Sequence, residues 1–450
     1  MSKFPDGFLW GTSTSSYQIE GAVNEDGRGE CIWHAFAHTP GKVRGGDTGD
    51  IACDHYHLYK SDIQLMKDLG YQAYRFSLSW PRILPTGRGT VNQAGIDFYS
   101  RLVDELLAAE ITPMITLYHW DLPTALPGGW VNRDTAHAFA EYAAVATRAL
   151  GDRVKMWTTL NEPWCSSLLS YYLGEHAPGE RNLARALEAA HYLLVAHGLA
   201  VPEIRSACKD AEVGIVLNLT PGVPASRSPA DLNSLRQFDG SLNRWFLDPL
   251  HGRRYPADMV KEYVALGAMQ SEQPNYMRED DFNLIAVPTD YLGINYYMMH
   301  TIQAVPGEEM QSQRWNVIKN PKLARTEMDW EVNPEGLYHI LLRVQEEYQP
   351  GKIYVAENGA AYNDAPDEQG KVHDTRRIDY LRGHIDAIGR AIQCGVPAAG
   401  YFTWSFMDNF EWAFGYSQRF GLVYVDFATQ RRYPKDSAYF YSEVTRNNGL

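Results

Sequence analysis

Long apolar runs, paired cysteines and an excess of positive charge are all missing from this 450-residue sequence. No segment approaches the roughly 20 consecutive apolar residues of a membrane-spanning helix, so we expect no membrane partner. The 55 acidic residues outnumber the 41 basic ones, which gives a formal net charge of −14. Because such a surface repels phosphate groups, nucleic acid is not an expected partner either.

Cysteine is scarce and shows no pairing pattern. The five cysteines form no CxxC motif, and they lie at Cys31, Cys53, Cys165, Cys208 and Cys394. This usage indicates reduced thiols rather than a disulfide framework or a zinc site. Residues 1–7 lack the apolar core and cleavage site of a secretory signal. We therefore expect a cytoplasmic protein.

The chain also lacks a flexible linker, which predicts a single domain over residues 1–450. What recurs is a short apolar run followed by an amphipathic helix. One such helix starts near Thr375 and ends before Gly395, and another carries an apolar stripe from Tyr99 to Leu107. The apolar runs predict eight strands, at residues 8–12, 72–77, 113–118, 155–160, 213–217, 291–295, 352–356 and 399–404.

This repeated strand–helix alternation predicts a parallel sheet covered by helices. No GxGxxG or P-loop pattern follows any strand, which disfavours an open nucleotide-binding sheet. We therefore predict a (β/α)₈ TIM barrel, in which the C-terminal ends of the strands converge on one site.

Polar and aromatic side chains gather at these predicted strand ends. Glu162 follows the fourth strand and Glu357 the seventh, so the two should face each other across the barrel mouth. Two carboxyls about 5–5.5 Å apart cleave a glycosidic bond with retention, whereas about 6.5–9.5 Å gives inversion. The residues alone leave that choice open, and they also leave open that both glutamates are solvated structural carboxylates.

The motifs around these residues resemble glycoside hydrolase family 1. Both TLNEP at 159–163 and ENG at 357–359 are similar to the two catalytic motifs of that family. The similarity includes FLWGTSTSSYQIEGA at 8–22, RFS at 75–77, YHWDLP at 118–123, WEV at 330–332, WSFMDNFEW at 404–412 and RFGLVYVD at 419–426. The resemblance implies a cofactor-free, metal-free retaining β-glycosidase on a (β/α)₈ barrel.

By this resemblance, Glu162 is the general acid/base and Glu357 the nucleophile. Arg75 and Asn295 are expected to support the nucleophile, with Tyr296 holding it by a hydrogen bond. The expected sugar-binding set is Gln18, His119, Asn161, Tyr296, Trp404, Glu411, Trp412 and Phe420. The leaving-group side is expected to comprise Trp330, Trp120, Cys165, Asn218 and His176.

The preferred function is β-glucosidase activity on unphosphorylated O-glycosides, with small β-glycosides and short oligosaccharides as partners. Glu411 would repel a sugar phosphate, and a retained acid at Glu162 indicates O-glycosides rather than thioglycosides. A transglycosidase and a galactosidase or fucosidase are the alternatives among enzymes. A non-catalytic sugar-binding protein is disfavoured because both carboxylates are present. The oligomeric state is left open.

Overall fold

The computed structural model describes residues 4–305 and 315–450 of the chain. Its centre is a closed barrel of eight parallel strands, in the order β1-β11-β10-β7-β5-β4-β3-β2. The strands are β1 (Leu9–Ser13), β2 (Ala73–Ser77), β3 (Thr112–Tyr118), β4 (Met156–Asn161), β5 (Glu212–Asn218), β7 (Tyr291–Asn295), β10 (Ile353–Asn358) and β11 (Ala398–Trp404). Each coincides with a predicted strand to within two residues at either end, and the predicted (β/α)₈ barrel is confirmed.

The ring closes where the first barrel strand meets the last. Ser13 of β1 pairs with Arg75 of β2 on one side and with Trp404 of β11 on the other. The Ser13 hydroxyl also donates a hydrogen bond to the Thr403 carbonyl at 2.8 Å. Because all strands run in one direction, their C-terminal ends form a single mouth.

A layer of buried apolar side chains fills the opposite end of the barrel. Most of these side chains stand at or near the starts of their strands, Phe402 stands past the middle of β11, and all are at most 6% exposed. They are Ala73, Met114, Met156, Tyr291, Tyr354 and Phe402. Since this layer blocks the N-terminal end, the barrel is open only at its mouth.

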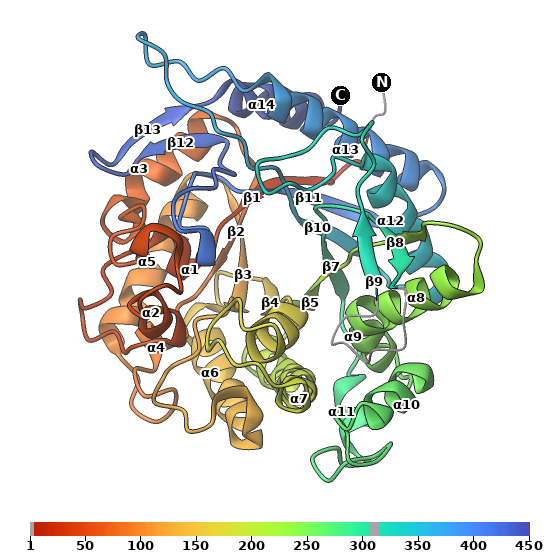
Figure 1. Cartoon of the computed structure of the whole chain (residues 1–450). Coiled ribbons are helices and arrows are strands. Elements are labelled where there is room, and N and C mark those ends of the chain that lie inside the picture. The colour runs from red at the N-terminus through yellow and green to blue at the C-terminus, as the bar shows by residue number, and fades with distance from the viewer. Residues whose placement is uncertain (1–3, 306–314) are drawn as a thin grey trace.

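Helices surround the barrel on all sides (Figure 1). The helices are α1 (Ser16–Ile19), α2 (Ile32–Ala37), α3 (His55–Asp68), α4 (Trp80–Ile83), α5 (Gln93–Ala108), α6 (Arg133–Leu150), α7 (Leu183–Ala207), α8 (Pro229–Asp239), α9 (Trp245–Leu250), α10 (Ala257–Ala265), α11 (Asp281–Ile285), α12 (Pro334–Tyr348), α13 (Thr375–Gln393) and α14 (Asp436–Asn447). Three short 3₁₀ turns are η1 (Arg44–Gly46), η2 (Gly129–Val131) and η5 (Trp412–Phe414), and two π-helical segments are η3 (Cys165–Tyr172) and η4 (Gly240–Arg244). None of the helices in the described part of the chain combines the length and apolar character needed to cross a membrane.

The two predicted amphipathic helices are present as α5 and α13. Their apolar stripes face the barrel, and Leu102 and Ile385 are among the buried side chains. Leu107, at the edge of the α5 stripe, is 40% exposed because the helix turns it toward solvent.

Two small sheets were not predicted. One contains β6 (Gly222–Pro224), β8 (His300–Ala304) and β9 (Trp315–Ile318), and the other is the antiparallel pair β12 (Val423–Asp426) and β13 (Arg431–Pro434). Strands of three to five residues are too short for a periodic pattern to stand out.

Candidate active site

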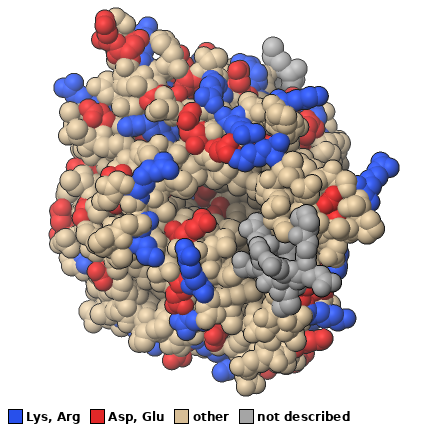
Figure 2. Space-filling view, viewed as in Figure 1, with Lys and Arg blue, Asp and Glu red and all other residues tan. Residues whose placement is uncertain are grey.

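A cavity of about 340 Å³ opens at the mouth of the barrel. Seen toward the mouth, the surface is hollowed near its centre, with acidic side chains in and beside the hollow (Figure 2). The residues of the predicted site that line it are His119, Trp120, Glu162, Cys165, His176, Asn218, Asn295, Trp330, Glu357, Trp404, Glu411, Trp412 and Phe420. Predicted catalytic, sugar-binding and leaving-group residues therefore share one cavity.

Glu357 stands at the end of β10 in a tight set of polar contacts. The strand is irregular here, because its register against β7 shifts between Val355 and Glu357. Arg75, which is fully buried, donates to Glu357 Oε1 at 2.6 Å, and the Tyr297 hydroxyl donates to Oε2 at 2.7 Å. Both carboxylate oxygens are thus held by donors, one of them cationic.

Glu162 has a different environment, just past the end of β4. Its backbone adopts φ of 50°, a left-handed conformation that is uncommon for a side-chain-bearing residue and common at functional sites. Asn295 Nδ2 donates to Glu162 Oε1 at 2.7 Å, and the Cys165 thiol donates to Oε2 at 3.1 Å. Both of these donors are uncharged.

These surroundings separate the protonation states of the two carboxyls. Burial, followed by the nearby charge on Glu357, raises the pKa of Glu162 to about 7. Burial also raises the pKa of Glu357, while the charge of Arg75 and the hydrogen bonds from Arg75 and Tyr297 lower it. Because Arg75 directly contacts Glu357, we take Glu357 as the group of the coupled pair that ionises first.

Arg75 and Asn161 connect the two glutamates beneath the cavity floor. Arg75 also donates to Asn161 Oδ1 at 2.7 Å, and Asn295 donates to the same oxygen at 3.0 Å. Arg75 and Asn161 are fully buried and contact residues that line the cavity. Asn295, expected to support the nucleophile, donates to Glu162, and its hydrogen bonding also lowers the pKa of Glu357.

His119 keeps one ring nitrogen without a hydrogen-bond partner among the described residues. Asn161 uses its carbonyl oxygen for Arg75 and Asn295, so its Nδ2 donates to His119 Nε2, at 3.1 Å. Burial holds the pKa of His119 well below its usual value, so the ring is neutral and its proton lies on Nδ1. That nitrogen is buried and has no hydrogen-bond partner in the described structure.

Glu411, on the cavity wall, and Gln18, which is fully buried and does not line the cavity, form a second polar group. Gln18 Nε2 lies 3.5 Å from Glu411 Oε2 and donates to Asn409 Oδ1 at 3.0 Å. Burial, then the charges on Glu357 and Glu162, raise the pKa of Glu411 to about 8. Among the described residues that line the cavity, none is a lysine or arginine.

One predicted contact is wrong: Tyr296 does not reach the nucleophile or the cavity. Its hydroxyl donates instead to the Asn333 carbonyl at 2.6 Å, on the side facing α12. The next residue, Tyr297, makes the expected contact with Glu357. Side chains alternate in direction along extended chain, so Tyr297 points to the same side as Asn295 and Tyr296 points away from it.

Aromatic rings form the cavity walls. His119 stacks on Trp404 with ring centroids 5.6 Å apart, and Trp412 packs against Trp120 at 4.5 Å. On the opposite wall, Trp330 lies 6.0 Å from the Phe420 ring. Flat apolar faces beside polar groups suit the C–H and hydroxyl surfaces of a sugar.

Some residues of the cavity wall were missed from the sequence. They are Trp164, Leu169, Glu175, Thr220, Leu242, Tyr297, Met298, His300, Met328 and Phe414. Five belong to loops, four lie in or beside short helical segments, and His300 belongs to the small β6-β8-β9 sheet; none of these segments carries a periodic signal. Trp164 could have been identified, because it directly follows the TLNEP motif.

A group of metal-type donors lies elsewhere. His34, His38 and Asp50 place one donor atom each within 4.8 Å of one another. His38 Nε2 is 3.1 Å from Asp50 Oδ2, and His38 Nδ1 is 2.8 Å from the His34 carbonyl oxygen. None of the three lines the catalytic cavity, so they have no part in the chemistry described below.

A closed (β/α)₈ barrel with two differently held carboxyls in a sugar-sized cavity defines a glycoside hydrolase. Comparison with known proteins agrees: the model of "Glycosyl hydrolase family 1" matches residues 1–450. The chain is 51% identical to the 1,4-beta-D-glucan glucohydrolase of Thermotoga neapolitana and 50% identical to beta-glucosidase A of Thermotoga maritima. These alignments cover 100% of this chain and 100% and 99% of the two relatives.

The solved structures show the same relationship. The family 1 β-glucosidase from Thermotoga maritima superposes with a TM-score of 0.95 at 49% identity, and the match covers 100% of both chains. The chain belongs to glycosyl hydrolase family 1, and the family resemblance read from its motifs is confirmed.

Proposed function

We propose that this chain is a retaining β-glucosidase that releases terminal β-D-glucosyl residues from unphosphorylated O-glycosides. The observation that supports the proposal most strongly is the unequal treatment of two carboxyls in one cavity. Glu357 contacts a guanidinium, whereas Glu162 has only neutral donors and a pKa of about 7. Such a pair can supply a carboxylate and a carboxylic acid at the same pH.

In the first step, the Glu357 carboxylate attacks the anomeric carbon while Glu162 gives its proton to the departing glycosidic oxygen. The bond to the leaving group breaks and a glycosyl ester forms on Glu357. In the second step, Glu162, now ionised, takes a proton from water. The water oxygen attacks the anomeric carbon and releases Glu357, so two inversions give a β-product.

The sugar is held by the polar residues on the barrel side of the cavity. We propose that the ring of His119 and the carboxyl of Glu411, which line the cavity, contact its hydroxyls. Contacts of Gln18 and Asn161 with the sugar stay predictions, because both side chains are fully buried outside the cavity lining. Trp404 offers an aromatic face, and Trp412 contributes its ring N–H. Phe420 closes the wall on the other side.

The leaving group occupies the outer part of the cavity. Trp330 and Trp120 offer flat faces to it, and Asn218 offers an amide. His176 is neutral at pH 7, because burial lowers its pKa to about 3, so it adds shape rather than charge. Cys165 is a wall residue: burial raises the pKa of its thiol well above the usual range, so it is not a nucleophile.

Product stereochemistry tests the proposal directly. Proton NMR during the first minutes of 4-nitrophenyl β-glucoside hydrolysis should show β-glucose before mutarotation produces the α-anomer.

A variant of the acid/base gives a second test. Glu162→Ala should hydrolyse this substrate slowly and regain rate with azide, because azide needs no proton removal to attack the glycosyl ester. Initial α-glucose, or turnover by Glu357→Gly close to that of the wild type, would refute the mechanism.

We propose further that residues 1–450 act as one catalytic domain. The cytoplasmic location and the absence of nucleic-acid and membrane partners stay predictions from composition. Limited proteolysis followed by calorimetry tests the domain organisation, because a single domain should unfold in one transition.

A further inference from the structure

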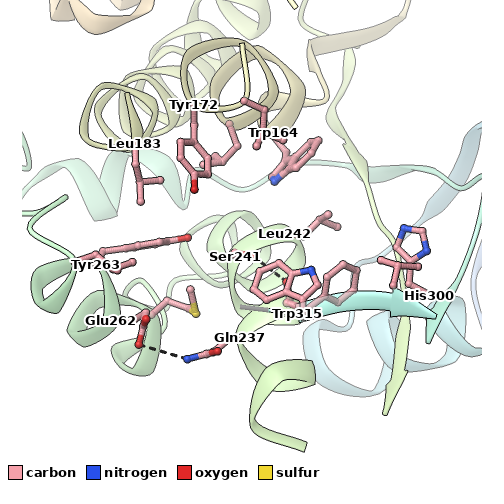
Figure 3. A pocket seen from close by; sticks show the side chains of 16 residues that line it. Trp164, Tyr172, Leu183, Gln237, Ser241, Leu242, Glu262, Tyr263, His300 and Trp315 are labelled. Atoms are coloured by element: carbon pink, nitrogen blue, oxygen red, sulfur yellow. Dashed lines mark hydrogen bonds between the residues drawn. The ribbon is translucent and has the colours of Figure 1, made fainter. Parts of the chain in front are cut away.

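A second cavity, of about 230 Å³, lies beside the catalytic one and is almost entirely apolar (Figure 3). It is enclosed by η3 and the start of α7 on one side, by α8, η4 and α10 on another, and by β8 and β9. Twelve of its sixteen lining residues are aliphatic or aromatic, and Leu183, Tyr263 and Trp315 are among them. Neither the proposed mechanism nor the predicted site uses this cavity.

The two cavities adjoin each other. Trp164, Leu242 and His300 line both of them. Trp164 is two residues beyond Glu162, so the shared wall begins next to the group proposed to protonate the leaving oxygen. The side pocket therefore adjoins the part of the catalytic cavity in which a substituent on that oxygen would lie.

The chemistry of the side pocket selects a neutral apolar occupant. None of its described lining residues is a lysine or arginine, and Glu262, its one acid, lies 3.4 Å from Gln237 Nε2 at the edge. Burial lowers the pKa of His300 to about 4, so His300 is uncharged at neutral pH. A sugar chain would leave most of its hydroxyls without partners here, whereas an alkyl chain would leave none.

We infer that the side pocket binds the alkyl tail of a β-glucoside whose sugar occupies the catalytic cavity. This inference rests on the proposed β-glucosidase function and extends it to amphiphilic alkyl glucosides. Each methylene that enters the pocket should raise kcat/KM by up to about fourfold, since its burial is retained in the transition state. Octyl β-glucoside should thus exceed methyl β-glucoside by at least about tenfold.

The test compares octyl β-glucoside, below its micelle concentration, with methyl β-glucoside. The variants are Leu183→Asp on α7 and Val317→Asp on β9, which lie in two different walls of the side pocket and outside the catalytic cavity. Each should lower the octyl-to-methyl ratio of kcat/KM about tenfold. The matched control is Leu232→Asp on α8, where the leucine is 48% exposed and outside the side pocket.

Three results would overturn the inference. One is an octyl-to-methyl ratio that is unchanged in both variants; the second is an equal loss in the control. The third is an equal loss for cellotriose, which would make the side pocket a sugar subsite. Failure to hydrolyse any β-glucoside would instead refute the proposed function, and calorimetric titration of the same variants with octyl β-glucoside would then decide on tail binding.

Discussion

Cys165 sets how readily Glu162 keeps its proton. Its thiol donates to Glu162 Oε2, and this bond favours the ionised carboxylate and lowers the pKa of Glu162. Removing the bond in Cys165→Ala should raise that pKa. The alkaline limb of the kcat/KM profile reports loss of the acid's proton, so it should move up by roughly half a pH unit.

The pH profile of kcat/KM on 4-nitrophenyl β-glucoside measures this shift. Cys53→Ala is the control, because Cys53 is also a buried thiol but donates to the Asp408 carbonyl, outside the catalytic cavity. An alkaline limb that stays in place or moves to lower pH in Cys165→Ala would contradict the assignment.

Two adjacent tyrosines form a second matched pair. Tyr297→Phe removes a hydrogen bond to charged Glu357, so kcat should fall about 10- to 100-fold. The same bond lowers the pKa of Glu357, and its loss should move the acid limb of the profile to higher pH. Steady-state kinetics across pH measures both effects.

Tyr296→Phe should leave kcat and both limbs near wild type. It loses only the bond to the Asn333 carbonyl, which should lower the free energy of unfolding by about 1 kcal/mol. The reverse pattern, a kinetic defect in Tyr296→Phe and none in Tyr297→Phe, would restore the original prediction from the sequence.

These tyrosines also show how far single residues could be predicted. The motifs identified Glu162 and Glu357, and the structure places both in one cavity. Between Tyr296 and Tyr297 the motif alone does not choose, yet strand alternation from Asn295 would have selected Tyr297. Which ring nitrogen of His119 carries the proton could not be predicted from the sequence. It depends on the hydrogen bonds that Arg75 and Asn295 donate to Asn161 in the folded protein.

At the level of elements, the end of β10 is packed without spare room. A Cβ atom on Gly359 would lie 1.7 Å from the Trp404 carbonyl oxygen, so β10 and β11 would have to separate. Gly359→Ala should therefore lower the free energy of unfolding by roughly 1–3 kcal/mol and reduce kcat strongly, because Glu357 lies two residues earlier. Chemical denaturation and kinetics measure the two effects.

Gly351 provides the control at the other end of the same strand. A Cβ there meets nothing within 4 Å, so Gly351→Ala should change neither stability nor kcat appreciably. Equal behaviour of the two alanine variants would mean that the contact between Gly359 and Trp404 does not position the nucleophile.

Secondary-structure elements differ in how well they can be predicted from their sequence. All eight barrel strands were predictable, because each is a buried apolar run between turn residues. The β6-β8-β9 sheet was not, since its strands are half-exposed and gain their partners from distant parts of the chain. Much of the outer cavity wall and of the side pocket depends on that sheet and its neighbouring loops, and this explains why those residues were missed.

At the scale of the whole molecule, the negative charge of the protein and of its catalytic cavity predicts which substrates are excluded. The net charge is −14, and the described lining of the catalytic cavity holds three glutamates besides Glu175 but no lysine or arginine. Above about pH 8, where Glu411 is ionised, a 6-phosphoglucoside should therefore have a kcat/KM about a hundredfold or more below that of the unphosphorylated glucoside. Paired assays of the two 4-nitrophenyl substrates measure the ratio.

The discrimination should also depend on pH in a defined direction. Glu411 has a pKa of about 8 in the free protein, so its charge appears as the pH rises through that value. Rejection of the phosphate should become stronger between pH 7 and pH 9. If the kcat/KM of the unphosphorylated glucoside divided by that of the 6-phosphoglucoside falls over this range, Glu411 does not face the 6-position.

The pairing of β1 with β11 also constrains how the protein folds during its synthesis. During synthesis, the polypeptide emerging from the ribosome must hold its first strand without a neighbour on one side until almost 390 further residues have appeared. Trp404 and Glu411 are synthesised with or just after the strand that closes the ring. Any nascent or clipped product that stops before them is an open sheet with an exposed edge, prone to aggregate rather than to act on sugar.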